Sequence, residues 1–231
     1  MRFIVTSFVV ASLAVGSFAA SEKEVLEMGK SIYEETCQSC HGEDGGGNEE
    51  ARFIVRPRAL SKSILREDQS YAIIEKGAHY WGASADIMPS FASTHSPEEL
   101  HAVAHYIAKH FNPDVDKRIN ELYAQSKPIP QKKQSKMQKR GAKIYKRNCS
   151  WCHGIEGRGD GEATRNPELS IFPYDLTKTL LDSKQIFLYI KYGGHYWGTY
   201  KNDMPNWAPK YDDFTLKSVT QYVVEHIKKG E

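Results

Sequence analysis

The sequence predicts an all-α protein made of two tandem helical domains. Three observations predict this fold: the chain repeats itself, the apolar residues of each copy recur with helical spacing, and strand patterns are few. With 40% hydrophobic and 26% charged residues over 231 positions, the composition is that of a folded globular protein. It excludes a disordered tail and a protein with many membrane spans.

The first twenty residues are typical of an export signal. Arg2 precedes an apolar stretch, which closes on small residues from Gly16 to Ala20. We expect residues 1–20 to be a signal peptide, cleaved after Ala19 or one residue later, and the mature protein to be periplasmic. The alternative is an uncleaved anchor, because the stretch approaches the roughly 20 apolar residues that a membrane-spanning helix needs.

The internal repeat has the size of a domain. At an offset of 112, the first copy superposes Gly29, Tyr33, Cys37, Cys40 and His41 on Gly141, Tyr145, Cys149, Cys152 and His153. At an offset of 116, it superposes His79-Tyr80-Trp81-Gly82 and Met88-Pro89 on His195-Tyr196-Trp197-Gly198 and Met204-Pro205. We place domain 1 at 21–111, a linker at 112–135 and domain 2 at 136–231. Two prolines in Lys127-Pro128-Ile129-Pro130 predict that the linker is an extended strap rather than a helix.

Each copy contains three predicted helices. The first ends at the cysteine pair, and the second ends at a glycine, at Gly77 in domain 1 and Gly193 in domain 2. The last begins at Ser96-Pro97-Glu98-Glu99, a capping-box pattern with proline at the first helical position, and its partner begins near Asp212. Because a glycine has no side chain, we expect Tyr106 and Tyr222 to press against the first helix at Gly29 and Gly141.

Each cysteine pair is followed directly by a histidine. The two segments are Cys37-Gln38-Ser39-Cys40-His41 and Cys149-Ser150-Trp151-Cys152-His153. Cys-x-x-Cys-His is the attachment pattern for c-type haem: two thiols add to the vinyl groups of the macrocycle, and the histidine presents its imidazole to the iron. The sequence therefore predicts two covalently attached haem c groups, one in each domain.

Two other uses of paired cysteines fit less well. A four-thiolate zinc site would require both domains to share one ion, and it would leave the histidines unexplained. A thioredoxin-like redox pair would be surrounded by alternating strands and helices, which neither copy predicts.

The second iron ligand is predicted from the aligned methionines. Met88 and Met204 align between the copies, each followed by proline, and a thioether ligand favours ferrous iron and raises the reduction potential. We therefore predict that His41 and Met88 bind one iron and that His153 and Met204 bind the other. The rival ligands are His79 and His195, which would make bis-histidine sites of lower potential.

These motifs resemble class I cytochrome c domains, and the pair is similar to the dihaem cytochromes of the c4 type. The resemblance rests on Gly29, Tyr33, Cys37-x-x-Cys40-His41-Gly42 and Met88-Pro89, with their equivalents in domain 2, and covers nearly all of the mature chain. It implies a small helical fold wrapped round each haem, with the first and last helices crossing. It also implies that Pro57 and Pro173 offer their carbonyl groups to the haem-binding imidazoles.

The expected function is electron transfer rather than catalysis, because an iron with six donors has no open position for a substrate. The expected partners are periplasmic or membrane-bound donor dehydrogenases or reductases and acceptor oxidases or reductases. Two alternatives stay open. One is a dihaem enzyme similar to thiosulfate dehydrogenases or peroxidases, and the other is the cytochrome subunit of a dehydrogenase complex.

Charge divides the chain into an acidic and a basic half. Residues 21–130 hold 12 Lys and Arg against 18 Asp and Glu, whereas residues 131–231 hold 18 against 11. The net charge of +2 gives no reason to expect a nucleic acid partner, and we expect membrane contact only by association or through an uncleaved signal. A basic run in the second half is interpreted as a solvated linker and helix face, with docking of an acidic redox partner as the alternative; it comprises Lys132, Lys133, Lys136, Lys139, Arg140, Lys143, Lys146 and Arg147.

Overall fold

The computed structural model describes residues 20–47, 57–83, 88–166, 172–199 and 204–229. The prediction of an all-α protein is confirmed, because these residues form helices, turns and loops and contain no strand. The predicted signal peptide lies almost wholly outside the described residues. Within the described part of the chain, no helix has both the length and the apolar character needed to cross a bilayer.

Domain 1 follows the predicted order of helices. It contains α1 (Glu22–Ile32), the π-helical turn η1 (Tyr33–Cys37), α2 (Gln38–His41), η2 (Leu60–Lys62), α3 (Glu67–Lys76) and α4 (Pro97–Phe111). The predicted capping box of α4 is present, because the Ser96 side chain accepts from Glu99 N and the Glu99 carboxylate accepts from Ser96 N. Helix α3 ends at Gly77, as predicted, with φ at 81°.

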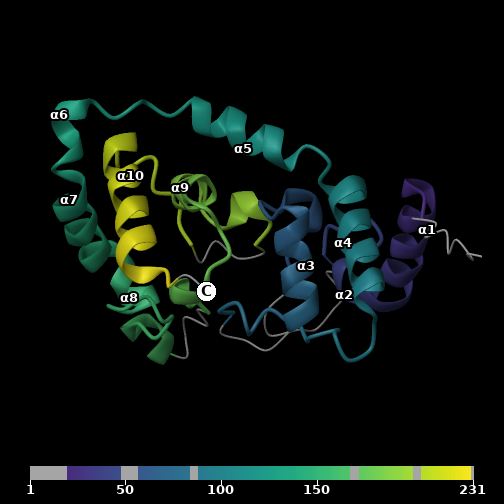
Figure 1. Cartoon of the computed structure of the whole chain (residues 1–231). Helices are drawn as coiled ribbons and strands as arrows, with labels where there is room; N and C mark the ends of the chain where they lie inside the picture. Colours follow the sequence, from purple (N-terminus) through teal and green to yellow (C-terminus); the bar gives the residue numbers. More distant parts are fainter. Residues whose placement is uncertain (1–19, 48–56, 84–87, 167–171, 200–203, 230–231) are drawn as a thin grey trace, which may run out of the picture.

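Domain 2 repeats this arrangement (Figure 1). It contains α7 (Met137–Ile144), η3 (Tyr145–Cys149), α8 (Ser150–His153), η4 (Glu162–Arg165), η5 (Leu176–Lys178), α9 (Ser183–Tyr192), η6 (His195–Trp197), α10 (Asp213–Tyr222) and η7 (Val223–Ile227). Asp212 caps α10 by accepting from Thr215 N at 2.9 Å.

The first and last helices of each domain cross at a glycine, as predicted. A Cβ atom on Gly29 would overlap the carbonyl oxygen of Ala102 on α4 and lie 2.8 Å from the Cβ of Tyr106. A Cβ on Gly141 would overlap the carbonyl of Ser218 on α10 and lie 2.9 Å from the Cβ of Tyr222. The two backbones therefore approach too closely for any side chain larger than hydrogen.

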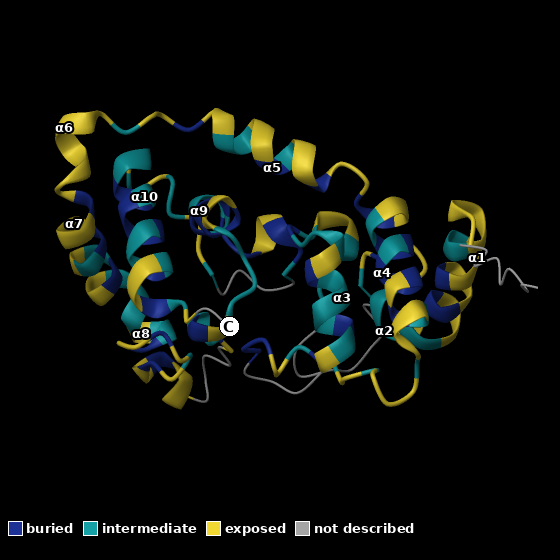
Figure 2. Ribbon diagram, in the orientation of Figure 1, coloured by how far each residue is buried: buried dark blue, intermediate teal, exposed yellow. Residues whose placement is uncertain are grey.

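The linker differs from its prediction. The extended segment is confined to the stretch around Lys127-Pro128-Ile129-Pro130, and helices α5 (Val115–Ala124) and α6 (Gln131–Gln134) lie on either side of it. Helix α5 packs on α9, and its Val115 and Ile119 join the hydrophobic core of domain 2 (Figures 1 and 2). Amphipathic spacing on α5 provides an apolar face, and burial of that face stabilises the helix.

The two domains meet through reciprocal contacts between equivalent residues. Gln69 and Gln185, which align at the offset of 116, exchange amide hydrogen bonds of 2.9 and 2.7 Å. Each amide also donates across the interface to an equivalent carbonyl, Leu180 O for Gln69 and Ile64 O for Gln185. Because these four hydrogen bonds form two pairs with the roles of the domains exchanged, the domains are related by an approximate twofold axis that passes between the two glutamines.

Candidate functional site

A π-helical turn sets the direction of each cysteine loop. Turns η1 and η3 follow α1 and α7 directly and end at Cys37 and Cys149, so one residue more than a regular helix is accommodated just before the loop. The Tyr33 hydroxyl donates to Gly42 O at 2.6 Å, and the Tyr145 hydroxyl donates to Gly154 O at 2.9 Å. In each domain a buried tyrosine at the start of the π-helical turn therefore holds the glycine that ends the Cys-x-x-Cys-His-Gly segment.

The first thiol of each pair is partly buried and protonated. None of the four cysteines forms a disulfide bond, and burial raises the pKa of Cys37 to about 11 and that of Cys149 to about 12. A redox-active cysteine pair or a thiolate metal site needs the opposite shift. Among the described residues, no group of three or more His, Cys, Asp and Glu side chains is placed to hold a metal ion.

The two histidines are held as neutral imidazoles. Burial lowers the pKa of His41 and of His153, and the hydrogen bond to a carbonyl only partly opposes this. Because a carbonyl can only accept, Nδ1 carries the proton in both rings and Nε2 keeps the lone pair that an iron requires.

The carbonyls that accept from these rings are not the predicted ones. His41 Nδ1 lies 3.3 Å from Arg58 O, and His153 Nδ1 lies 3.2 Å from Tyr174 O. The prediction of Pro57 and Pro173 was therefore wrong by one residue. The Arg58 guanidinium lies 4.9 Å from the centre of the Tyr174 ring, so the two acceptor residues also touch each other across the domain interface.

Each predicted methionine packs on the same core as the first cysteine of its domain. Met88 and Cys37 contact the core of domain 1, and Met204 and Cys149 contact the core of domain 2. The Met88 carbonyl accepts from Ala78 N at 3.0 Å, and the Met204 carbonyl accepts from Gly194 N at 2.8 Å. The methionine loops are thereby attached to the ends of α3 and α9. Ligation of iron by these two side chains stays a prediction.

The repeated His-Tyr-Trp-Gly motif builds a loop and the domain interface. His79 and His195 are exposed, and their Nδ1 atoms pair with local carbonyls at 3.0 and 3.2 Å. The indole groups of Trp81 and Trp197 donate to the carbonyls of Ala72 and Leu188 on the preceding helix. Both indole N–H groups therefore have their acceptor within the protein.

The glycine of this motif explains its repetition. Gly82 O accepts from Asp175 N at 2.7 Å, and Gly198 O accepts from Ala59 N at 3.0 Å, so the two domains again exchange equivalent bonds. Both glycines have positive φ, and a Cβ would lie within 2.6 Å of a carbonyl oxygen of the other domain. Sequence analysis noticed the motif but missed this role, because a repeat does not reveal that its copies touch.

The donor set of each domain fits a covalently attached haem. Each supplies two adjacent cysteines, a neutral imidazole oriented by a carbonyl, and a methionine attached to the same core. Domain 2 adds an indole N–H, that of Trp207, which is buried and has no hydrogen-bond partner within the described residues. A buried donor of this kind needs an acceptor, and a haem propionate is one. The residue that aligns with it in domain 1 is Phe91.

Comparison with known proteins gives one family match that covers both domains. The family described as "Cytochrome C oxidase, cbb3-type, subunit III" matches residues 24–107 and 136–223. These two segments hold both cysteine pairs, both histidines and both methionines of the predicted sites.

Two individual proteins are similar over different spans. The dehydrogenase subunit of a quinone alcohol dehydrogenase from Acetobacter aceti is 27% identical over 107 residues, which is 45% of this chain and 13% of that protein. A chain from a reducing HAO-like protein complex of Kuenenia stuttgartiensis covers 91% of this chain and matches over 100% of its own length. Its identity is 23% and its TM-score is 0.44, so this likeness carries no argument about function.

Proposed function

The chain belongs to the family of cytochrome c domains described as cbb3-type cytochrome c oxidase subunit III, and from this premise we propose that it carries single electrons between redox partners through two haem c groups. Membership concerns the two matched segments, residues 24–107 and 136–223, and not the oxidase complex in the family's description. The proposal includes export by residues 1–20 and a periplasmic site of action, supported by the charged start, apolar middle and small-residue end of that segment.

One observation carries the proposal: both domains present the same donors in the same local structure. In each, Cys-x-x-Cys-His follows a π-helical turn, and the histidine Nδ1 is bound to a carbonyl. Haem c supplies an iron that changes oxidation state by one electron. The residues of this chain hold it covalently through Cys37, Cys40, Cys149 and Cys152 and orient the imidazoles.

The methionines decide between a carrier and an enzyme. With Met88 and Met204 as the remaining ligands, neither site has a vacant position for a substrate, and the same ligands in both oxidation states keep reorganisation small. Without them, a vacant position would favour a dihaem enzyme.

Spectroscopy with redox titration tests this. Purified holoprotein is expected to contain two haems per chain, to show the weak absorption near the red end that methionine bound to ferric haem gives, and not to bind cyanide readily. Met88→Ala and Met204→Ala should each remove half of that absorption and lower one potential by on the order of 100 mV, within the range of about 0.8 V that axial ligands control. A high-spin spectrum in the unmodified protein, with rapid cyanide binding, would reject the carrier function.

The similarity to a quinone alcohol dehydrogenase subunit favours a second candidate function, in which the chain is the cytochrome subunit of a dehydrogenase complex. Purification from the native host without detergent and at low salt tests it. A free carrier elutes at the size of the single chain, whereas a subunit co-elutes with a dehydrogenase.

A further inference from the structure

A row of basic side chains lies along the outer face of α7 and η3. Lys139, Lys143 and Lys146 follow one another at intervals of four and three residues, so they share one helix face, and Arg147 widens it. All four are exposed, whereas Met137, Gly141 and Tyr145 are buried against α10 and the domain core. We call these four residues the basic stripe.

The basic stripe has no internal counter-charge. Within the described ranges, none of its four residues has a carboxylate within ion-pair distance. Other members of the basic run are engaged in the fold, because Arg140 donates to the Thr215 hydroxyl at 2.8 Å and, with Lys133, lies against the Phe214 ring. The structure thus removes Lys133 and Arg140 from the candidate docking residues, and the stripe is the part of the run that shares one helix face next to the cysteine loop.

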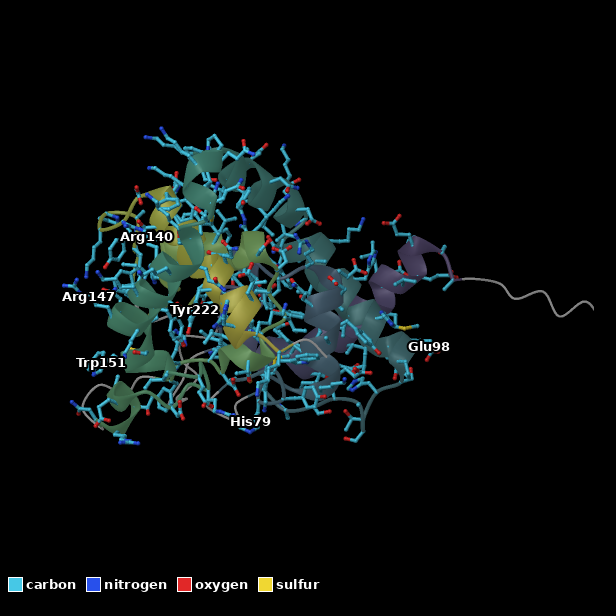
Figure 3. The ribbon with its side chains drawn as sticks, turned by 60° about the vertical axis from the view of Figure 1, so that its left-hand side comes forward. His79, Glu98, Arg140, Arg147, Trp151 and Tyr222 are labelled. Atoms are coloured by element: carbon cyan, nitrogen blue, oxygen red, sulfur yellow. The ribbon has the colours of Figure 1, made fainter. Side chains whose placement is uncertain are left out.

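An apolar patch continues from the stripe at the cysteine loop. Trp151 lies between the two cysteines and is 53% exposed, and Ile155 follows the haem-binding histidine and is 74% exposed. Figure 3 shows Arg147 and Trp151 on the same edge of domain 2. Among the acidic groups that follow along the chain, Glu156 and Glu162 are each paired with an arginine, Arg158 and Arg165, and Asp160 is exposed. Large exposed apolar side chains rimmed by charge are typical of interaction sites.

Domain 1 has the opposite chemistry at the aligned positions. Glu27, Glu34 and Glu35 stand where domain 2 has Lys139, Lys146 and Arg147, and Ser39 and Glu43 stand where it has Trp151 and Ile155. Two of these glutamates are partly neutralised by Lys23 and Lys30 at 3.7 and 3.6 Å. The helix, the π-helical turn and the loop are the same in both domains, so the difference is confined to the surface.

We propose that the basic stripe, with Trp151 and Ile155, is the docking site for an acidic electron-transfer protein, so that domain 2 is the point of electron exchange with that partner. The proposal rests on the proposed function. The unpaired cations attract and orient the partner, and the apolar patch excludes water next to the covalent attachment point. One electron leaves domain 2 of the reduced protein and reduces the partner's redox centre, and no proton or further reactant is needed.

Two other occupants are less well matched. A second copy of this chain would bring its own acidic Glu34 and Glu35 to the stripe, but those residues lie in a face without an apolar counterpart to Trp151. An anionic membrane attracts basic residues too. It gives no reason for the apolar patch to coincide with the cysteine loop. Both become outcomes of the test.

The test measures electron transfer from the reduced holoprotein to plastocyanin, an acidic blue-copper protein, whose Cu(II) is reduced to Cu(I). Stopped-flow rates are recorded between about 10 and 300 mM ionic strength. The triple variant Lys139→Glu/Lys143→Glu/Lys146→Glu is expected to lower the second-order rate constant at low salt at least tenfold, since steering of this kind changes association by about 10- to 1,000-fold. Trp151→Ala should lower it about threefold to tenfold and leave the salt dependence unchanged.

A matched control carries the same change of charge elsewhere. Lys62→Glu/Lys117→Glu/Lys178→Glu alters three exposed lysines outside the stripe and is expected to change the rate less than twofold at high salt and distinctly less than the stripe variant at low salt. The visible spectrum, the two potentials and the melting temperature must match those of the unmodified protein in all variants. A small cationic cobalt(III) phenanthroline complex, which needs no docking site, reports whether electrons leave the protein at all.

The outcomes separate the docking site from the function. If the cobalt complex oxidises the protein but both triple variants react equally with plastocyanin, the docking site is wrong and the carrier function stands. If neither probe accepts electrons, the function itself fails. Binding to phosphatidylserine vesicles, or concentration-dependent self-association, that the stripe variant abolishes while the plastocyanin rate is unchanged would also overturn the proposal in favour of a membrane or a second copy.

Discussion

Domains 1 and 2 share their interior and differ in their surface. The crossing glycines, the tyrosine that fastens the cysteine loop, and the carbonyl that orients the histidine recur with nearly the same geometry. The outer face of the first helix changes from glutamate in domain 1 to lysine and arginine in domain 2. The difference shows which features the cofactor site requires and which ones are free to select a partner.

Support from outside each domain also differs. Domain 2 gains Ile64 from domain 1, and Val115 and Ile119 from the linker helix α5, as members of its core. Among the described residues, the core of domain 1 contains only its own residues. Domain 2 is therefore the one whose stability depends on the rest of the chain.

The largest expected effect is a loss of stability when the glycine at either helix crossing is replaced, and it tests whether the two crossings are equivalent. Gly29→Val and Gly141→Val should each cost about 3 kcal/mol of unfolding free energy, because the added side chain overlaps a carbonyl of the crossing helix. Denaturant unfolding of the holoprotein, followed by circular dichroism and visible absorbance, measures this cost. Ser31→Ala on the exposed face of α1 is the control and should change stability by less than about 0.5 kcal/mol. A cost below about 1 kcal/mol at either glycine would show that the crossing tolerates separation.

The next largest effect concerns the buried indole of Trp207, which is present in domain 2 and has no equivalent in domain 1. Trp207→Phe gives domain 2 the residue that domain 1 has at the aligned position, Phe91, and removes the buried indole donor. Loss of one hydrogen bond leaves more negative charge on the propionate near the iron, so it should lower one reduction potential and leave the other unchanged. The shift is at most about 40 mV, which corresponds to about 1 kcal/mol acting on one oxidation state alone. Spectroelectrochemical titration measures both potentials. Unchanged potentials would mean that the indole does not contact the cofactor.

The smallest expected effect is a change in how the stability of the protein depends on pH, caused by Asp182 at the domain interface. Burial alone raises the pKa of Asp182, but hydrogen bonds from Gln185 N and the Arg66 guanidinium outweigh it, so the folded-state pKa lies below its usual value. The stabilisation is therefore complete above the unfolded-state pKa of about 3.9 and is lost as the pH falls through the lower folded-state value. Asp182→Asn keeps a good helix cap and removes the charge.

We expect this variant to lose about 0.5 kcal/mol at pH 7, since solvent screens a partly exposed pair, and to show a shallower decline of stability in acid. Urea unfolding at pH values from about 7 to 3 measures the decline. If the stability of Asp182→Asn and that of the unmodified protein depend on pH in the same way, the Arg66–Asp182 ion pair does not stabilise the interface.

Local sequence patterns predicted the helices and the cysteine loops well. The second helix of domain 2 ends at Gly193, as predicted, and it begins at Ser183, where Asp182 and Gln185 form a capping box. A capping box involves only residues within one helical turn, so it can be recognised from the local sequence alone. The close approach at Gly29 and Gly141 was also predictable, since only glycine leaves a helix surface that flat.

Contacts between distant segments were not predictable in the same way. Helix α5 was missed because its stability comes from burial of Val115 and Ile119 in a core formed by later residues. The role of Gly82 and Gly198 depends on which faces of the domains meet, and no pattern within one copy specifies that. The carbonyl acceptors were wrong by one residue because peptide orientation after a proline depends on loop geometry.

The reciprocal contact between the domains has a consequence for the origin of the molecule. Gln69 and Gln185 donate to and accept from each other, so the contact surface is self-complementary. Such a surface can pair two identical domains without any difference between them. A one-domain ancestor bearing it would already pair with itself, and joining two genes end to end would only make a pre-existing homodimer permanent. Arg66 and Asp182 are equivalent positions of the two domains and form an ion pair with each other. In a homodimer both positions would hold the same residue, so this pair of unlike charges requires that the two domains be encoded separately, as they are after fusion.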